Sequence, residues 1–342
     1  MTLMAKKNIK EFLLEELRME LERLGEPGYR AVQVFQWLFK KGVTDFSEFS
    51  NLPNSLREKL RENFLIDGFE LFGRLRAQDG TEKFLFKLED GNFIETVLIP
   101  SGHRATLCLS TQVGCKFACA FCASGLKGYK RNLSAGEILD QILYAKFTLG
   151  QELTNFVFMG MGEPLDNFEN VARAIRLMNT PEGLGIAARR ITVSTSGVIP
   201  GIERFKELGL QVGLSLSLHS ANDGLRGRLM PISRTFALER VLKACEDYMR
   251  ATGRKMTIEV VLIAGVNDSI QDAAGLRAIA KRLKAKVNLI PYSPCPGLDF
   301  KTPPDGVIDA FQRELSAGGV SVTLRRSKGR DILAACGQLA GR

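Results

Sequence analysis

The stretch TQVGCKFACAFCASG, residues 111–125, contains three of the seven cysteines of the chain. Cys115, Cys119 and Cys122 follow a C-x3-C-x2-C pattern within eight positions. Thiolates bind soft metals, and iron–sulfur clusters are held mainly by cysteine. Gly114 and Gly125 flank the cysteines, and glycine lets a backbone turn tightly. The pattern predicts a loop around a [4Fe–4S] cluster, in which three ligands leave one iron open for chemistry.

Two other interpretations of these cysteines stay open at the level of the sequence. A structural zinc site needs four ligands, usually in two close pairs. The chain has only two histidines, His103 and His219, and no second close cysteine pair. Cys108 is a poorly spaced fourth ligand. Alternatively, the three cysteines are small buried apolar residues.

Strands and helices alternate after Ala105. Most of the apolar segments are separated by amphipathic stretches, and the stretch that starts at Ser134 carries Glu137 three residues later, as in a capping box. This order predicts an α/β fold with a parallel sheet, either open or curled into a partial (β/α)6-type barrel, with its chemistry at the carboxyl ends of the strands. The predicted strands are ATLCLS (105–110), NFVFMGM (155–161), RRITVSTSG (189–197), VGLSLSLH (212–219), MTIEVVLI (256–263), KVNLIPY (286–292) and SVTLRRS (321–327).

The first third of the chain has a different organisation. Residues 1–64 predict a small helical domain, whose first two helices end at Gly25 and Gly42 and whose third follows Pro53. In residues 65–104 the apolar period changes to two, and Asp-Gly pairs at 79–80 and 90–91 predict β-hairpins. We expect a small antiparallel connector sheet there, and the barrel over residues 105–342.

Composition narrows the class of protein. The chain has 342 residues, enough for about two domains, and its 45% hydrophobic and 25% charged residues are typical of a globular protein. There is no apolar run of 18 residues, and the charged N-terminus lacks the apolar core of a signal peptide. These features predict a cytoplasmic protein without a membrane span. An odd number of cysteines in a reducing compartment argues against a disulfide framework.

The chain is basic, with a formal net charge of +9. This balance favours a polyanionic partner, nucleic acid first, although a merely basic soluble protein has the same charge. Residues 281–286 (KRLKAK) and 325–330 (RRSKGR) each contain four basic residues. We expect them to contact phosphates, the alternative being a solvated charged face. A further docking surface is predicted in the helical domain from Lys6, Lys7, Lys10, Arg30, Lys40 and Lys41.

The cysteine pattern, with Phe121 before its last cysteine, resembles the radical S-adenosylmethionine (SAM) superfamily. In that superfamily the amino and carboxylate groups of SAM chelate the open iron, and the reduced cluster cleaves SAM to a 5′-deoxyadenosyl radical. The segment MGMGEP, residues 159–164, resembles the superfamily's glycine–glutamate motif. The resemblance therefore implies that Gly162 and Glu163 meet the SAM amino group.

Polar residues also stand at the ends of later predicted strands. Taken singly, each is more often a satisfied strand-end group than a ligand, but polar groups at successive strand ends are what a barrel site requires. The resemblance implies SAM contacts at Ser194, Ser217, His219 and Asn288, and also at Leu218, the apolar residue between Ser217 and His219.

A narrower resemblance covers almost the whole chain. The segments LCLSTQVGCKFACAFCASGLKGYKRNLSAGEI, FMGMGEPLDN, RRITVSTSGV and DILAACGQLAG together are similar to the RlmN/Cfr family of RNA adenosine methyltransferases. The resemblance implies that SAM methylates Cys336 and that the resulting thiomethylene radical adds to the base. It also implies that Cys108 resolves the adduct by forming a disulfide with Cys336, and that Glu95 accepts a proton.

The same resemblance implies partners and specificity. Val113, in QVGC, matches RlmN-like members, where Cfr-like members tend to have cysteine, and this favours C2 over C8 of adenine. The implied substrates are an adenosine in 23S rRNA and, as a second substrate left open, an adenosine beside the anticodon of tRNA. We expect a monomer that takes electrons from a donor such as flavodoxin, with Cys245 and Cys295 structural. Three alternatives remain: C8 methylation, a radical enzyme with another substrate, and a non-catalytic RNA-binding protein with a structural metal.

Overall fold

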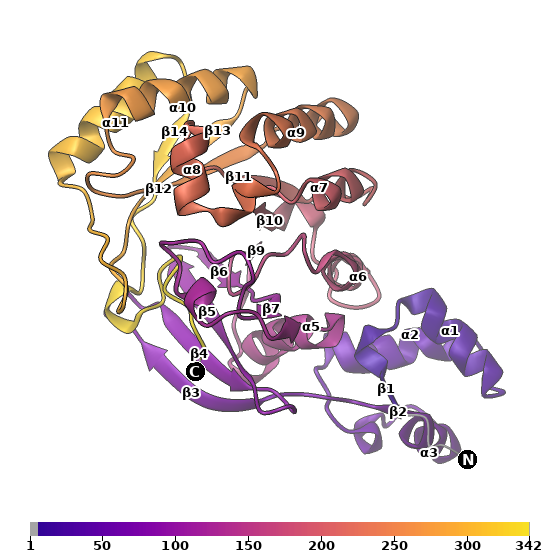
Figure 1. Ribbon diagram of the computed structural model, residues 1–342. Helices are drawn as coiled ribbons and strands as arrows, with labels where there is room; N and C mark the ends of the chain where they lie inside the picture. The colour runs from indigo at the N-terminus through magenta and orange to yellow at the C-terminus, as the bar shows by residue number, and fades with distance from the viewer. Residues whose placement is uncertain (1–5, 342) are drawn as a thin grey trace.

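The computed structural model describes residues 6–341, which form a curved sheet with helices on its outer side and a small group of helices near the N-terminus (Figure 1). The helices are α1 (Leu14–Arg23), α2 (Arg30–Phe35), α3 (Asn54–Asn63), α4 (Ala123–Leu126), α5 (Ala135–Leu143), α6 (Phe168–Asn179), α7 (Ile199–Lys206), α8 (Asp223–Leu229), α9 (Leu238–Thr252), α10 (Ile270–Arg282) and α11 (Asp305–Ala317). The strands are β1 (Lys7–Asn8), β2 (Phe64–Leu65), β3 (Glu70–Arg76), β4 (Glu82–Lys87), β5 (Phe93–Ser101), β6 (Arg104–Cys108), β7 (Gln112–Val113), β8 (Arg131–Asn132), β9 (Asn155–Phe158), β10 (Ile191–Thr195), β11 (Gly213–Ser217), β12 (Thr257–Leu262), β13 (Lys286–Pro291) and β14 (Val322–Leu324).

The barrel consists of parallel strands paired in chain order, β6-β9-β10-β11-β12-β13-β14. All of the strands predicted after Ala105 are confirmed. A helix returns the chain between successive strands, so six β/α units are followed by the short strand β14. The capping box that starts α5 is also confirmed, because the Ser134 side chain accepts a hydrogen bond from the Glu137 backbone. The strands carry apolar side chains toward the helices, which buries a continuous core.

The two predicted hairpins are confirmed, but they do not form a sheet of their own. Strands β3, β4 and β5 are antiparallel, and Gly80 and Gly91 have the positive φ angles, 82° and 79°, that their turns require. Strand β5 then turns back and pairs with β6. Because this pairing continues the hydrogen-bond ladder, the hairpins extend the barrel into one ten-stranded sheet.

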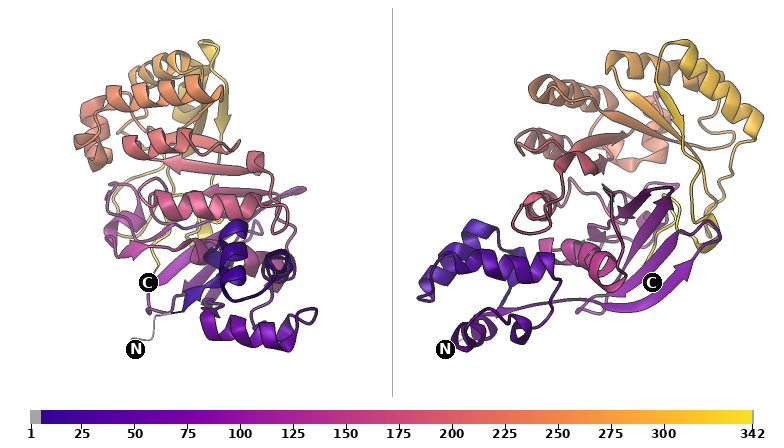
Figure 2. Two further views of the ribbon diagram at one scale, coloured as in Figure 1. Left: turned by 90° about the vertical axis from the view of Figure 1, so that its right-hand side faces the viewer. Right: turned by 180° about the vertical axis from the view of Figure 1, so that it is seen from behind.

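The three predicted N-terminal helices are confirmed. Helix α1 is followed by Gly25 at a φ of 77°, and α2 continues through a π-helical turn, Gln36–Lys40, toward Gly42 at a φ of 67°. The helices stand beside the barrel near α5, and the chain reaches β3 through an extended segment (Figure 2). They enclose an aromatic core, in which Phe35, Phe39 and Phe49 are fully buried.

A buried ion pair joins this helical group to the barrel. The Lys10 ammonium contacts the Asp140 carboxylate of α5 and the Asp67 carbonyl, and both charged side chains are almost fully buried. Burial raises the pKa of Asp140 to about 6, although Lys10 acts in the opposite direction. Because its side chain is buried, Lys10 cannot contact RNA at the surface. The prediction that it belongs to an RNA-docking surface is wrong. Lys7, Lys40 and Lys41 are exposed.

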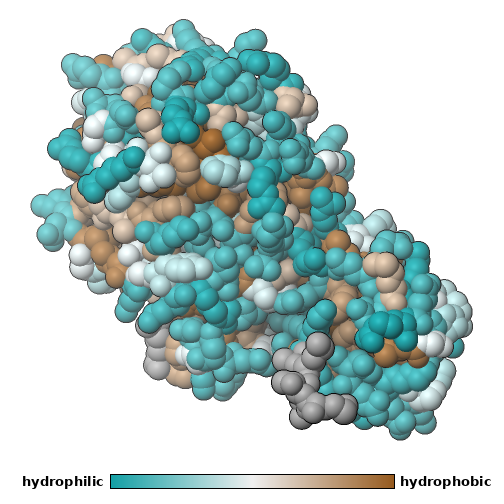
Figure 3. All heavy atoms as spheres, turned by 45° about the vertical axis from the view of Figure 1, so that its right-hand side comes forward, coloured by the Kyte–Doolittle hydropathy of each residue, from teal (hydrophilic) through white to brown (hydrophobic). Residues whose placement is uncertain are grey.

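The face shown in Figure 3 is mainly hydrophilic, with apolar residues in scattered smaller areas. Among residues 6–341, none of the helices combines the length and the hydrophobicity needed to cross a lipid bilayer.

The Lys10–Asp140 pair predicts a large effect on stability. Lys10→Met leaves a buried carboxylate without its counter-charge, which costs about 3–5 kcal/mol. We expect urea unfolding to show that loss, and the double variant Lys10→Met/Asp140→Leu to recover most of it. The exposed pair Lys243–Asp247 on α9 is the control, and Lys243→Met should change stability by less than about 1 kcal/mol. If Lys10→Met and Lys243→Met lowered the free energy of unfolding equally, the assignment of a stabilising buried ion pair to Lys10 and Asp140 would be wrong.

Candidate active site

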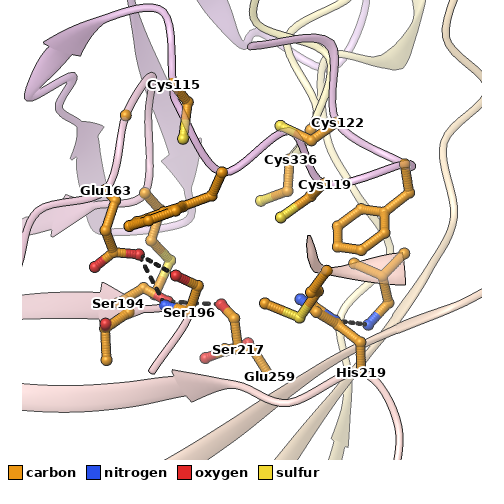
Figure 4. Close-up of a pocket in the computed structure, with 18 of the residues that line it drawn as sticks. Cys115, Cys119, Cys122, Glu163, Ser194, Ser196, Ser217, His219, Glu259 and Cys336 are labelled. Atoms are coloured by element: carbon orange, nitrogen blue, oxygen red, sulfur yellow. Dashed lines mark hydrogen bonds between the residues drawn. The ribbon is translucent and has the colours of Figure 1, made fainter. Parts of the chain in front are cut away.

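A cavity opens at the carboxyl ends of the parallel strands (Figure 4). Together with its opening to solvent, the hollow contains about 910 Å³ of empty space. Its walls combine thiols, carboxylates and hydroxyls with aromatic and aliphatic side chains. The predicted site residues that line it are Cys115, Cys119, Cys122, Gly162, Glu163, Ser194, Ser217, His219 and Cys336.

The cysteine loop leaves β7 and is shaped by close backbone contacts. Gly114 has a φ of 73°, and a Cβ at this position would lie 1.7 Å from the Gly128 carbonyl oxygen. Glycine is therefore required there. Ala120 donates a backbone hydrogen bond of 2.9 Å to Leu229, which ends α8. The loop is thus attached to the wall of the barrel.

The three thiols point into the cavity from different parts of this loop (Figure 4). Burial raises the pKa of Cys115 to about 12, and burial also raises the pKa of Cys119 well above its usual value. Metal binding therefore has to displace protons from these thiols. Within the described part of the chain, no three His, Cys, Asp or Glu side chains converge as a single ion requires. A [4Fe–4S] cluster needs less convergence, because each cysteine binds a different iron. The donor set and its place in the cavity therefore fit a cluster.

Glu163 is a buried carboxylate in the cavity wall. Its Oε2 atom accepts hydrogen bonds of 2.8 Å from both the backbone and the hydroxyl of Ser196, and Oε1 accepts one of 3.1 Å from Leu165. Burial raises its pKa, and these hydrogen bonds oppose the shift. Gly162 precedes it with a φ of 96°, and a Cβ there would approach Gln112 to 2.5 Å. The geometry holds a carboxylate ready for a cationic ligand.

Hydroxyls from two neighbouring strands meet beside this carboxylate. The Ser194 Oγ on β10 lies 3.2 Å from the Ser217 Oγ on β11. His219 follows at a φ of 60°, and its Nδ1 atom accepts a hydrogen bond of 3.0 Å from the Val261 backbone. Its ring packs edge-on against Phe121 at a centroid distance of 4.6 Å. These contacts fix the ring as a neutral imidazole in the wall of the cavity.

Two predicted cofactor residues do not line the cavity. The Leu218 side chain is fully buried, and its carbonyl accepts a hydrogen bond from Arg226. Asn288 donates a hydrogen bond of 2.9 Å to Glu259.

Sequence reasoning missed the polar wall residues Ser196 and Glu259, and also the buried Arg226, which supports the wall without lining it. A signal was present for Glu259, which is the only charge inside the apolar strand MTIEVVLI. Nothing in the local pattern marks Ser196 or Arg226, because each acquires its role from contacts with distant segments.

The C-terminal segment crosses the cavity and brings Cys336 into it. Ala123 donates a backbone hydrogen bond of 2.7 Å to Gly337, and Gln338 donates one of 2.6 Å to the Pro294 carbonyl. Cys336 is exposed, and its accessible surface faces the cavity. Desolvation within the cavity raises the pKa of the Cys336 thiol, and the nearby Glu259 carboxylate adds to the shift.

Glu95 and Cys108 lie behind the lining. The Glu95 carboxylate forms an ion pair of 2.9 Å with Lys83, and it accepts hydrogen bonds from the backbones of Ala340 and Gly341. Burial raises the pKa of Cys108, and the nearby thiol of Cys336 adds to the shift. The family resemblance implies a disulfide between Cys108 and Cys336. In this structure both residues are free thiols, as are the other five cysteines.

The buried imidazole of His219 predicts a pH dependence of stability. Burial, with Arg226 nearby, lowers its pKa from 6.5 to about 3. Below pH 6.5 the unfolded chain takes up a proton that the folded protein refuses, so stability falls by about 1.4 kcal/mol per pH unit. His219→Asn removes this dependence, and asparagine tolerates the positive φ. We expect the unfolding free energy of the wild type to lose about 2 kcal/mol relative to this variant between pH 7 and pH 5.

The exposed histidine is the control for this measurement. His103→Asn should leave the difference between pH 7 and pH 5 as it is in the wild type. If the free energies of unfolding of the wild type and of His219→Asn changed by the same amount between pH 7 and pH 5, the assignment of a neutral buried imidazole would be wrong.

Comparisons with known proteins agree with this geometry. Residues 109–276 match the radical SAM superfamily, and residues 7–66 match the ribosomal RNA large subunit methyltransferase N-terminal domain. A probable dual-specificity RNA methyltransferase RlmN from Caldicellulosiruptor saccharolyticus is 44% identical, over 98% of each chain. The corresponding protein of Bacillus licheniformis is 44% identical, over 97% of this chain and 93% of its own.

A solved structure is also closely similar. The radical SAM methyltransferase from Sphaerobacter thermophilus superimposes with a TM-score of 0.94 at 41% identity, covering 98% of this chain and all of its own. Fold, cysteine loop and full-length similarity therefore lead to one conclusion: the chain belongs to the RlmN family of radical SAM RNA methyltransferases.

Proposed function

We propose that this protein methylates C2 of a specific adenosine in 23S rRNA, with tRNA as a second substrate, through an S-methylated Cys336. One observation carries the proposal: Cys336, from the end of the chain, lines the same cavity as Cys115, Cys119 and Cys122. A [4Fe–4S] cluster that leaves one iron open for SAM takes three cysteines, so a fourth thiol in the same cavity is available for a separate role.

Enzymes of this superfamily use a [4Fe–4S] cluster and SAM, which together supply a 5′-deoxyadenosyl radical. In our proposal the three loop cysteines hold the cluster, and Gly162 and Glu163 receive the SAM amino group. Ser194, Ser217 and His219 complete the wall around the cofactor. Leu218 and Asn288 act through the neighbours that they contact. The buried lining keeps water away from reactive species.

A thiol that carries the methyl group allows methylation of a carbon that is not a nucleophile. C2 of adenine is an electrophilic amidine carbon, which does not attack a methyl sulfonium. In the proposed reaction the Cys336 thiol would first receive a methyl group from one SAM, with release of S-adenosylhomocysteine and the thiol proton. The methyl group would then give a hydrogen atom to the 5′-deoxyadenosyl radical derived from a second SAM. The carbon radical on Cys336 adds to C2, so the protein becomes covalently joined to the RNA.

Cys108 and Glu95 complete the proposed reaction. Glu95 would take the proton from C2, and the adduct would give up one electron, for which a bound cluster would be the acceptor. The Cys108 thiolate would then attack the Cys336 sulfur. An S–S bond forms, the bond from the Cys336 sulfur to the methylene carbon breaks, and the methylene carbon takes a proton to become the methyl group on C2. Burial raises the pKa of the Cys108 thiol, and Cys336 lies near enough to add to that shift, which supports the pairing. The contacts of Glu95 with Ala340 and Gly341 place its carboxylate on the segment that carries Cys336.

The two basic runs differ in their relation to the cavity. Residues 325–330 follow β14 and lead directly to Cys336, with Arg325 and Arg330 exposed. Residues 281–286 run from the end of α10 to the first residue of β13, so they lie at the amino end of that strand, opposite to the cavity. We propose that the first run holds RNA phosphates while the target base is extruded into the cavity. The exposed lysines of residues 1–64 dock a more distant part of the RNA.

The preference for C2 rests on Val113, which is buried in β7 beside the cysteine loop. We further propose a cytoplasmic monomer that is reduced by a flavodoxin-type donor, with residues 65–104 as connector and 105–342 as the catalytic part. Cys245 and Cys295 are buried, and the proposed reaction gives them no role.

The cluster assignment predicts the metal content. After anaerobic reconstitution the wild type should contain about four iron and four sulfide per chain, whereas Cys115→Ala/Cys119→Ala/Cys122→Ala should retain less than about a tenth of that. Cys245→Ala, which changes a buried cysteine of α9, is the control and should load normally. Zinc without sulfide in the wild type would contradict the proposal and favour a structural metal.

The methylation chemistry predicts distinct products. With SAM, reductant and a 23S rRNA fragment, the wild type should yield 2-methyladenosine by mass spectrometry of the digested RNA. Cys336→Ala should lower the yield by more than about a thousandfold, because the methyl carrier is lost, while cleavage of SAM continues. The isomer 8-methyladenosine, or unchanged turnover by Cys336→Ala, would overturn the proposal.

Cys108 is tested in the same assay. Cys108→Ala should accumulate a covalent protein–RNA species, visible as a nuclease-sensitive band of reduced mobility in a denaturing gel. Cys295→Ser serves as its control and should release product normally. Release of methylated RNA by Cys108→Ala at the wild-type rate would remove the resolving role.

A further inference from the structure

A small apolar surface lies on the segment that follows the cysteine loop. Leu126 and Tyr129 leave 57% and 41% of their surfaces exposed, although both side chains are large and hydrophobic. Leu126 ends α4, the short helix that begins directly after Cys122. Neighbouring apolar side chains that are exposed and bordered by charge are typical of interaction sites. The proposed reaction uses neither residue.

Two lysines border these apolar side chains. Lys127 and Lys130 are exposed, and neither forms an ion pair with a carboxylate among residues 6–341. The chain has no acidic residue between Glu95 and Glu137, whereas this interval contains five lysines and arginines. We refer to residues 126–130 as the 126–130 surface. It combines an apolar centre with positive charge that no nearby segment of the chain compensates.

This surface is built onto both ends of the cysteine loop. The Lys130 backbone donates a hydrogen bond of 2.9 Å to the Val113 carbonyl, and β8 pairs with β7 directly beside it. At the other end, Gly125 donates a backbone hydrogen bond of 3.1 Å to Cys122. A Cβ on Gly125 would lie 2.8 Å from the Ala118 Cα atom, so the segment packs closely on the loop. The 126–130 surface is therefore the outer side of the loop that carries the three thiols.

In the proposed function the site in this loop requires an electron from outside the protein. Electron transfer slows steeply with distance, so a carrier has to dock close to the cysteines. Leu126 follows Cys122 by four residues, which is about 6 Å along the axis of a helix. The cavity itself has to admit SAM and the target base. A carrier consequently needs a different face of the loop, and the 126–130 surface provides one.

The chemistry of this surface indicates the kind of partner. Complexes that transfer electrons have small interfaces, and interfaces commonly place apolar residues at the centre and polar residues at the rim. The uncompensated charges of Lys127 and Lys130 attract an acidic protein. RNA is the competing partner, but phosphates are recognised best by arginine, which this surface lacks. Leu126 also offers no ring on which a base can stack. The composition therefore favours a protein.

We propose that the 126–130 surface docks an acidic one-electron carrier protein of the flavodoxin type. Leu126 and Tyr129 form the centre of the contact, and Lys127 and Lys130 form its rim. This inference rests on the proposed function and gives the proposed donor its docking site. One electron passes from the flavin hydroquinone anion of the carrier to the oxidised cluster. The flavin becomes the neutral semiquinone, so no proton moves and no bond breaks.

Binding is measured with the cluster-loaded full chain and oxidised flavodoxin as the probe, in anaerobic calorimetry at low salt. Oxidised flavodoxin has no electron to give, so the measurement is independent of activity. Lys127→Glu/Lys130→Glu should bind flavodoxin at least about tenfold more weakly than the wild type, because like charges then face each other. Leu126→Ser/Tyr129→Ser should bind about tenfold more weakly at any salt concentration, because the apolar centre is lost. At high salt the loss in the lysine variant should shrink to less than about threefold.

Electron delivery is measured separately by stopped-flow absorbance of the cluster. With flavodoxin hydroquinone below saturation, Lys127→Glu/Lys130→Glu should be reduced at least about tenfold more slowly than the wild type. Dithionite is a small reductant that needs no docking surface. It should reduce the variant and the wild type at rates within about twofold of each other.

A matched variant controls for the change in net charge. Lys281→Glu/Lys286→Glu makes the same change at the amino end of β13, and both of its lysines are exposed. It should bind flavodoxin within about twofold of the wild type, because charges far from the contact are screened. Each variant is required to hold wild-type iron, and loss of iron in Lys127→Glu/Lys130→Glu would assign these lysines to the support of the loop and overturn the inference.

Two further results would overturn the inference while the proposed function stands. The first is wild-type affinity for flavodoxin in both variants of the 126–130 surface. The second is weakened binding of the 23S rRNA fragment by Lys127→Glu/Lys130→Glu with flavodoxin binding intact, which would assign the surface to RNA. The proposed function fails on a different observation, namely that the wild type forms no 2-methyladenosine even when dithionite supplies the electrons.

Discussion

The pairing of neighbouring parallel strands in one register is the constraint on which the site depends. Parallel strands end at the same edge of a sheet, so residues far apart in the chain meet there. Ser194, Ser217 and Glu259 come from three consecutive strands and form one wall in this way. A shift of one residue in any strand would turn its polar side chain away from the cavity. The packing of the helices against the sheet therefore stabilises the geometry of the site as well as the fold.

The antiparallel extension of the sheet has a clear structural purpose. Strand β4 supplies Lys83, and β5 supplies Glu95. Lys83 donates a hydrogen bond to the Leu333 carbonyl, and Glu95 accepts hydrogen bonds from Ala340 and Gly341. These contacts enclose the segment that carries Cys336 on both sides. The parallel part of the fold holds the same segment through Ala123 and the Pro294 carbonyl, so both parts of the sheet anchor it.

A buried arginine connects the walls of the cavity. Arg226 is fully buried on α8, and it donates hydrogen bonds to the carbonyls of Ser196 and Leu218 and to the Ser233 hydroxyl. Within the described residues no carboxylate accepts a hydrogen bond from it. Ser196 in turn holds Glu163, so one guanidinium supports several strand ends at once. Buried carbonyl groups without a hydrogen-bond donor would cost free energy, and the guanidinium supplies donors to two of them. These hydrogen bonds offset the cost of burying its charge.

The amino-acid sequence by itself determined the alternation of strands and helices, the two hairpins and the cysteine loop. Each of these depends on local patterns: apolar periodicity, Asp-Gly turns, and ligands within eight positions. Only the tertiary structure decided that the hairpins extend the barrel, that Lys10 is buried against Asp140, and that Cys336 reaches the cavity. It also decided that Asn288 contacts Glu259 rather than the cavity. The physical reason is that strand register, burial and ion pairing join residues widely separated in the chain, and no local pattern records such contacts.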